Sequence, residues 1–158
     1  ANAAGSVWTP QTKFDRPPSW NANTAGWMNG MDADFLAVIG KTTKVTCRNT
    51  LTDNGGSDTT KDKFFLLSSC EVFMENEVGN VTEGEAYPYY SDYSDYTSPN
   101  TGADSNRVKY RGGSLQSWVL RTPNHRNGFD ITIVNSTGAK GTHGATTKEG
   151  VSPACNII

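Results

Sequence analysis

Few residues in this chain stand at spacings that would support catalysis. His125 and His143 lie in stretches rich in Gly, Asn and Thr, and neither has a nucleophile motif beside it. Glu83 and Glu85 are candidates for paired catalytic carboxylates, but neighbours on one strand do not flank a substrate from two sides. Cys70 has no cationic neighbour to lower its pKa, and no His/Cys spacing predicts a zinc site. We therefore expect no enzymatic activity, no metal and no cofactor.

The chemistry of a contact surface is found instead in residues 84–97 (GEAYPYYSDYSDYT). Tyrosines offer broad, rigid faces that can stack on sugar rings, while Asp and Ser can bind hydroxyl groups, as in antibody combining sites. The predicted ligand or partner contacts are Tyr89, Tyr90, Asp92, Tyr93, Asp95 and Tyr96. The alternative is that Tyr87 and Tyr89 point inward from a strand, while the other tyrosines pack on neighbouring loops.

Composition limits the class of protein and its partners. The chain has 158 residues, a net charge of −2 and a hydrophobic content of 35%. This length suits one domain, and the abundance of Gly, Asn, Thr and Ser favours short strands joined by long loops. No cluster of Lys and Arg predicts nucleic-acid binding, and no apolar run is long enough to insert into a bilayer.

Three cysteines, Cys47, Cys70 and Cys155, leave at least one without a disulfide partner. Because Cys70 and Cys155 stand within apolar runs, we expect three reduced, structural thiols, with these two buried. A secreted scaffold built on disulfides is the alternative.

The elements that must position these groups are mostly strands. Apolar or β-branched runs bounded by turn residues predict strands of one core at residues 63–73, 117–121, 129–134 and 151–157. Residues 42–52 predict another strand, and the DNGG turn at 53–56 should lead from it to the strand at Phe64. Asp32 is expected to cap a short helix through Gly40, whose inner face is formed by Phe35, Leu36, Val38 and Ile39.

Two strands carry residues with expected structural roles. Trp118 is predicted to lie in the core because of its size and its apolar neighbours. Arg121 can clamp a carboxylate through two hydrogen bonds, and Glu71 in residues 63–73 is its natural partner. The alternative is a solvated arginine without such a partner.

The first 26 residues form an arm that differs in composition from the globular part, residues 27–158. Prolines stiffen the arm, and large aromatic side chains are spaced along it. We expect Trp8 or Trp20 to anchor the arm on another chain, because exposed apolar surface is usually an interface. The alternative is that the arm folds back beside Trp27 on its own domain.

The order FLLS-x-x-E-V-F, EG-x-A-Y-x-Y-Y, W-x-L-R-[ST]-P and GV-x-PA-C resembles a domain of unknown function. That domain occurs in Firmicute, gut-metagenome and phage proteins, typically with the motifs WWLRSP and GVRPA. The resemblance covers roughly residues 28–158, with Val119 in place of the second Trp and Ser152 in place of the Arg. The family is similar to C-type-lectin-like and formylglycine-enzyme-like folds. It implies a strand-dominated α+β domain with long loops and one or two short helices.

From the residues and this resemblance, we expect a non-enzymatic module at a virion or extracellular surface. A phage fibre, decoration protein or receptor-binding protein would suit it, with other virion proteins, further copies of the chain or a glycan as partners. One alternative is an enzyme of the formylglycine-generating type, or an inactive remnant of one. Another is a purely structural spacer in a virion or cell surface.

Overall fold

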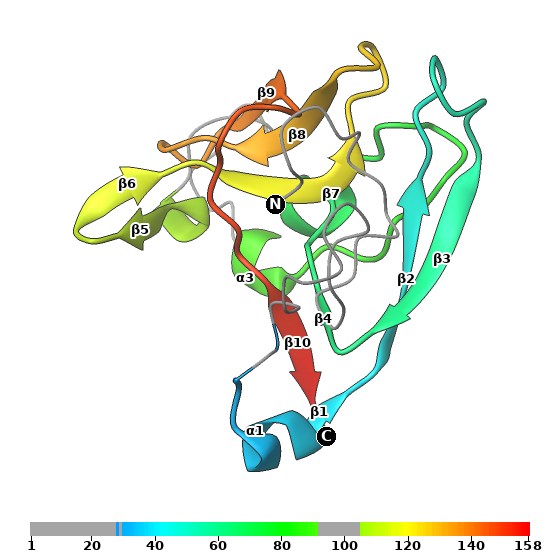
Figure 1. Cartoon of the computed structure of the whole chain (residues 1–158). Helices are drawn as coiled ribbons and strands as arrows, with labels where there is room; N and C mark the ends of the chain where they lie inside the picture. The colour runs from blue at the N-terminus through cyan, green and yellow to red at the C-terminus, as the bar shows by residue number, and fades with distance from the viewer. Residues whose placement is uncertain (1–27, 29, 92–104) are drawn as a thin grey trace.

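The computed structural model describes residue 28 and residues 30–91 and 105–158. These residues form a small α+β domain in which short strands dominate and the sheets are open (Figure 1). In chain order, the elements are α1 (Ala33–Ala37), β1 (Ile39–Gly40), β2 (Thr42–Cys47), β3 (Ser57–Asp62), β4 (Phe64–Phe65), α2 (Ser69–Phe73), α3 (Pro88–Ser91), the 3-10 turn η1 (Ser105–Arg107), β5 (Lys109–Arg111), β6 (Ser114–Gln116), β7 (Trp118–Pro123), β8 (Asp130–Val134), β9 (Lys140–Gly144) and β10 (Ala154–Ile157).

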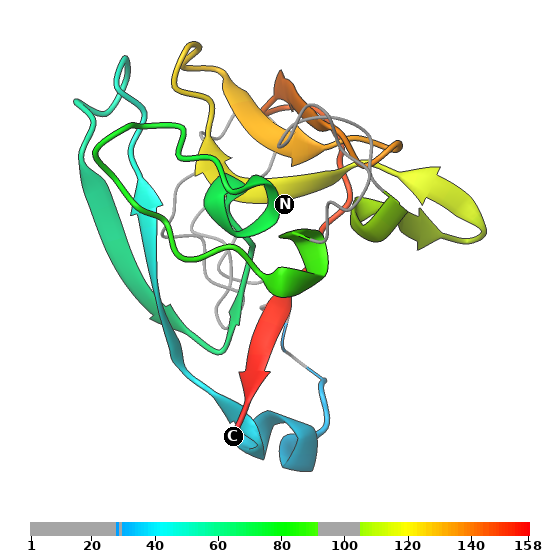
Figure 2. The ribbon, with the colours of Figure 1, turned by 180° about the vertical axis from the view of Figure 1, so that it is seen from behind.

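All strand pairs within the sheets are antiparallel. The orders are β7-β8-β9, β1-β10-β4, β2-β3 and β5-β6. Strand β7 connects several parts of the fold, because it also forms a parallel bridge from Trp118 to Gly150 and donates from Arg121 N to Leu67 O (2.8 Å) in the segment before α2. The β5–β6 hairpin projects from one side of the body, and α1 with the β1–β10 pair projects from another (Figures 1 and 2).

Side-chain alternation along β7 divides the apolar interior between two clusters. Successive side chains of a strand point to opposite faces. Trp118 and Leu120 therefore pack in one cluster with Phe73 and other side chains, while Val119 packs in a second cluster with Ile133. Both faces of β7 are covered, which explains why its first five residues are all buried. The predicted strands at 117–121 and 129–134 and the core position of Trp118 are confirmed.

The prediction of one strand over residues 63–73 was wrong. Strand β4 ends at Phe65, and α2 begins at Ser69. The Ser68 hydroxyl accepts a hydrogen bond from Glu71 N (3.1 Å), and the Glu71 carboxylate accepts one from Ser68 N (2.9 Å). This reciprocal capping box starts the helix, and Met74 ends it with a left-handed φ of 56°.

The helix predicted from Asp32 to Gly40 is present but shorter. The Asp32 carboxylate caps it by accepting from Phe35 N (2.9 Å), and it ends at Ala37, because the chain then enters β1 to pair with β10. On the predicted inner face, Ile39 is buried and Leu36 is half-buried. The prediction was wrong for Phe35 and Val38, which are exposed.

The DNGG turn is present but leads to a different strand. Positive φ values at Asn54, Gly55 and Gly56 turn β2 into β3, and β4 follows only after that hairpin. Strand β3 has the sequence SDTTKD, which carries no apolar residue and therefore no hydrophobic pattern.

At the other end of the chain, the predicted strand at 151–157 is confirmed only for Ala154–Ile157.

Candidate functional site

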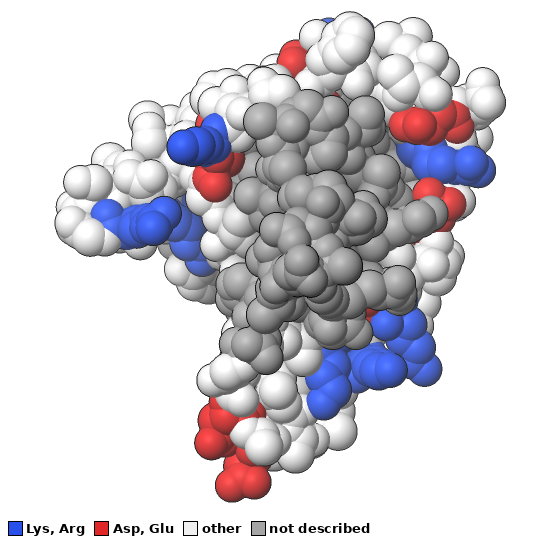
Figure 3. Space-filling model, in the orientation of Figure 1, with Lys and Arg blue, Asp and Glu red and all other residues white. Residues whose placement is uncertain are grey.

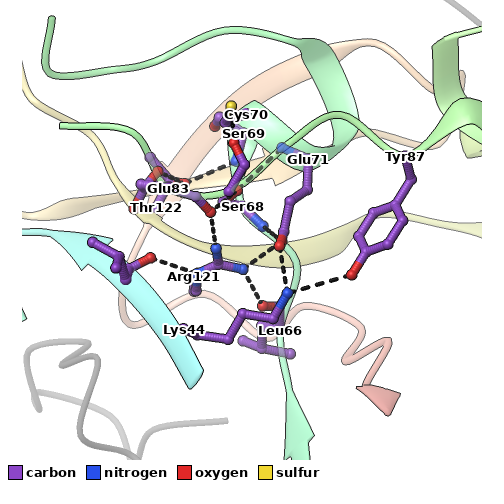
Figure 4. Close-up of polar contacts among 12 residues, drawn as sticks. Lys44, Leu66, Ser68, Ser69, Cys70, Glu71, Glu83, Tyr87, Arg121 and Thr122 are labelled. Atoms are coloured by element: carbon purple, nitrogen blue, oxygen red, sulfur yellow. Dashed lines mark hydrogen bonds and ion pairs between the residues drawn. The ribbon is translucent and has the colours of Figure 1, made fainter. Parts of the chain in front are cut away.

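A group of charged side chains lies inside the domain, between β2, α2 and β7 (Figure 4). We call it the buried ion cluster, and it consists of Lys44, Glu71, Glu83, Arg121 and Thr122. Strand β2 contributes Lys44, α2 contributes Glu71 and β7 contributes Arg121 and Thr122, while Glu83 comes from the segment before α3. Charges in an apolar interior must be paired or hydrogen-bonded.

Arg121 is the hub of the buried ion cluster. Its Nη1 lies 2.5 Å from Glu71 Oε2 and donates to Leu66 O (2.8 Å), while its Nε donates to Val45 O (3.2 Å). Its Nη2 donates to the backbone carbonyl of Glu83. Arg121 and Glu71, expected as partners, are therefore in direct contact, with side chains only 6% and 2% exposed.

Lys44 supplies the second cation. Its Nζ lies 2.6 Å from Glu71 Oε1 and donates to the Tyr87 hydroxyl (3.3 Å). The same ammonium sits 4.1 Å from the centre of the Phe65 ring. Glu71 thus has one cation on each carboxylate oxygen, in addition to its capping bond.

Glu83 has no direct ion pair with a side chain among the described residues. Its carboxylate accepts from Cys47 N (2.8 Å) and from the Thr122 hydroxyl (2.5 Å). The Thr122 hydroxyl in turn accepts from Ser69 N (2.8 Å), which ties β7 to the start of α2. Burial raises the pKa of Glu83, although these hydrogen bonds and nearby Arg121 act in the opposite direction.

The contacts of the buried ion cluster indicate a structural role. Its donors and acceptors are directed at one another and at backbone groups, and they join β2, α2 and β7.

The thiols beside it are poor nucleophiles: burial, with a contribution from Glu83, raises the pKa of Cys47 and of Cys70. All three cysteines are free; Cys47 and Cys70 are buried, but Cys155, predicted to be buried, is only partly so.

The remaining candidates for chemistry are the carboxylate pair and the two histidines. Glu83 is buried whereas Glu85 is exposed, so the two do not form a carboxylate pair on one face. His125 Nδ1 lies 2.5 Å from a Glu77 oxygen, and His143 contacts Glu149. The glycine-rich surroundings of His143 indicate a loop, but His143 belongs to strand β9.

Within residues 84–97, which we call the tyrosine segment, Pro88–Ser91 form helix α3, where the alternative prediction had a strand. Tyr89 is 64% exposed, whereas Tyr90 is 8% exposed and packs 6.5 Å from the Trp118 ring, so Tyr90 is a core residue and not a contact residue as predicted. The alternative prediction, in which Tyr87 and Tyr89 point inward, is correct for Tyr87, which packs against the core, and wrong for Tyr89. The remaining predicted contacts and arm anchors lie outside the described residues: Asp92, Tyr93, Asp95, Tyr96, Trp8 and Trp20.

Three features were missed by sequence reasoning. Lys44 and Glu83 belong to the buried ion cluster, but nothing local in the sequence marks them as partners of Glu71 and Arg121. The β5–β6 hairpin was also missed, although Gly112-Gly113 between two short polar and apolar stretches is a hairpin signal.

Within residues 28, 30–91 and 105–158, no three His, Cys, Asp or Glu side chains converge as metal ligands. No helix in this part of the chain is both long and apolar enough to span a membrane.

Comparison with known proteins identifies one related family. A family model described as "Domain of unknown function (DUF6273)" matches residues 19–158. No curated protein and no solved structure matches the chain.

Proposed function

We propose that this chain, which belongs to the DUF6273 family of domains of unknown function, is a non-enzymatic binding module of a virion or extracellular surface. A phage fibre, decoration or receptor-binding protein is the assembly we favour. A C-type-lectin-like arrangement of its loops belongs to the same proposal. The ligand would be a cell-surface glycan bound on the tyrosine segment.

The observation that carries this proposal is the contrast between two neighbouring tyrosines. Tyr90 is anchored in the core, while the Tyr89 ring is exposed to solvent. The centres of the two rings are 5.1 Å apart, and the rings are arranged edge to face. The backbone there is held by bonds from Tyr87 N to Glu71 O (3.0 Å) and from Asn106 Nδ2 to Tyr89 O (3.3 Å). An exposed aromatic ring on a fixed backbone is suited to binding, because little conformational freedom is lost.

The sequence beyond α3 extends the same chemistry. Tyr93 and Tyr96 add aromatic faces, and Asp92 and Asp95 add acceptors for sugar hydroxyls. Two observations disfavour the alternative of a formylglycine-generating type of enzyme. The carboxylates of the buried ion cluster are engaged in structural contacts, and the raised pKa of Cys47 and Cys70 disfavours the reactive thiolates that such enzymes use.

A glycan array probed with the labelled full chain tests the proposal. We expect retention on a subset of glycans and a loss of at least about tenfold in apparent affinity for Tyr89→Ala, as for an interface anchor. Phe129→Ala, which removes another exposed aromatic ring, is the matched control and should bind as the wild type does. Failure to bind any glycan, or equal binding by Tyr89→Ala, would favour the structural spacer.

A further inference from the structure

Two projecting ends of the domain carry exposed apolar side chains and charges of opposite sign. One is the β5–β6 hairpin, which we call the basic hairpin. The other consists of α1 with the β1–β10 pair, which we call the acidic end. They project from different sides of the body in both ribbon views (Figures 1 and 2).

The basic hairpin is ordered but buries little of itself. Gly112 and Gly113 both have positive φ (58° and 81°), as a tight two-residue turn requires. Tyr110 and Leu115 face each other across the strands, and both are exposed, Tyr110 to 69%. At the base, Trp118 Nε1 donates to Arg107 O (2.9 Å), which fixes the hairpin on the core. A two-stranded hairpin is marginal by itself, so an exposed apolar pair on it is a candidate contact.

The basic hairpin carries cations that no carboxylate of the described residues pairs with. Residues 105–126 contain no Asp or Glu, and neither Lys109 nor Arg111 forms an ion pair with a described residue. Figure 3 shows Lys and Arg on the projecting hairpin without an acidic residue at its tip. The cations alternate with Tyr110 along β5, but a two-stranded ribbon is thinner than the Debye length of about 8–10 Å, so their field acts around both faces.

The acidic end carries the opposite charge at the start of α1, whereas Lys63 Nζ donates to Leu36 O farther along the same helix. Helix α1 buries none of its residues, and its first turn carries Asp34 after the capping Asp32, both exposed. Neither carboxylate forms an ion pair with a described cation, and Figure 3 shows the acidic patch where α1 lies. Exposed apolar side chains of this end are Phe35, Val38, Ile157 and Ile158. Just outside the paired strands, Ile158 N donates to Val38 O (2.9 Å).

We propose that the basic hairpin of one copy docks on the acidic end of a second copy. The apolar pair Tyr110 and Leu115 would pack on Phe35 and Val38, with Arg111 near the carboxylates. Each surface repels its own kind, so a two-fold symmetric contact between like surfaces is disfavoured. The contact is therefore head-to-tail, which produces a ring or an open chain of copies. This inference does not depend on glycan binding by the tyrosine segment.

Sedimentation equilibrium of the full chain, over a concentration series in 0.05 M and 0.5 M NaCl, tests the contact. We expect self-association that weakens with salt and is weakened about tenfold or more by Arg111→Glu, because attraction becomes repulsion. The variant D32N/D34K should associate equally poorly, while its Asn keeps the helix cap. Arg126→Glu, the same change on an exposed loop, is the control and should associate as the wild type does.

The decisive sample is a mixture of Arg111→Glu and D32N/D34K. In either variant alone, the hairpin and the helix end of two copies carry charges of the same sign and repel each other. In the mixture, the acidic hairpin of Arg111→Glu can bind the basic helix end of D32N/D34K, so the mixture should associate more strongly than either variant. A wild type that stays monomeric at about 1 mM in low salt, well above most specific affinities, overturns the proposal. So does association of the wild type that neither variant weakens or that the mixture fails to restore.

Discussion

Replacing Arg121 with methionine tests whether the buried ion cluster holds the fold together. Methionine keeps an unbranched apolar stem but removes the guanidinium that donates to Glu71 and to the carbonyls of Leu66 and Val45. Because the side chain is almost fully buried, water cannot readily replace these donors. Glu71 then keeps Lys44 as its one cation among the residues of the cluster.

The expected cost follows from the loss of a buried ion-pair partner. Removing one member of such a pair costs about 3–5 kcal/mol, and orphaned carbonyl groups place this variant toward the upper end, at about 4–5 kcal/mol. For a domain of this size, each kcal/mol lowers the melting temperature by about 2–4 °C, so a decrease of about 8–20 °C is expected. Urea unfolding followed by circular dichroism gives the free energy of unfolding, and a thermal melt gives the temperature.

Lys44→Met is the matched control, because Lys44 also contacts Glu71 but is partly exposed and makes fewer hydrogen bonds. Its expected cost is about 2 kcal/mol, as for a hydrogen bond to a charged group. The double variant R121M/E71Q should be more stable than Arg121→Met, since a neutral Gln needs no cation and can still accept the capping bond. If Arg121→Met is no worse than Lys44→Met, or if the added Gln destabilises further, the hub role of Arg121 is refuted.

Three other predictions concern the interior. The folded-state pKa of Glu83 is raised, so the folded chain binds more protons than the unfolded chain above the ordinary value of 4.5, and stability should fall as pH rises from there through the folded-state pKa. Urea melts at several pH values should show this decline flattened in Glu83→Gln; an identical decline contradicts it. In native protein, a thiol reagent should modify the partly buried Cys155 first and Cys47 last, with rapid reaction of all three only after denaturation. Prompt native labelling of Cys47 would contradict its burial. Trp118→Ala should cost roughly 3–5 kcal/mol as a buried large aromatic; an unshifted thermal melt would mean that the indole does not support the core.

Local signals in the sequence were sufficient for several elements. Apolar or β-branched runs bounded by turn residues predicted β7 and β8, and the side-chain chemistry of Asp32 predicted the start of α1. These features depend on residues within a few positions of one another. The pairing of Arg121 with Glu71 could also be expected, because few other groups in the flanking motifs could satisfy an arginine in an apolar strand.

Other local signals were present but weaker than competing ones. All five residues of α2 are buried, so the segment shows no apolar stripe of helical period and resembles a buried strand. The capping pair Ser68 and Glu71 was the signal that distinguished the helix. Strand β3 is polar throughout, and only its pairing with β2 makes it a strand.

The buried ion cluster itself was decided by tertiary structure. Arg121 lies 50 positions from Glu71 and 38 from Glu83 along the chain, and Lys44 lies 27 positions from Glu71. Their charges are stable inside the domain only because packing of β2, α2 and β7 brings donors and acceptors within hydrogen-bond distance at the same time. The exposure of Tyr89 beside the buried Tyr90 was decided in the same way. The two tyrosines differ in exposure because the Tyr90 ring packs in the cluster that contains Trp118, whereas helix geometry directs the Tyr89 ring to solvent.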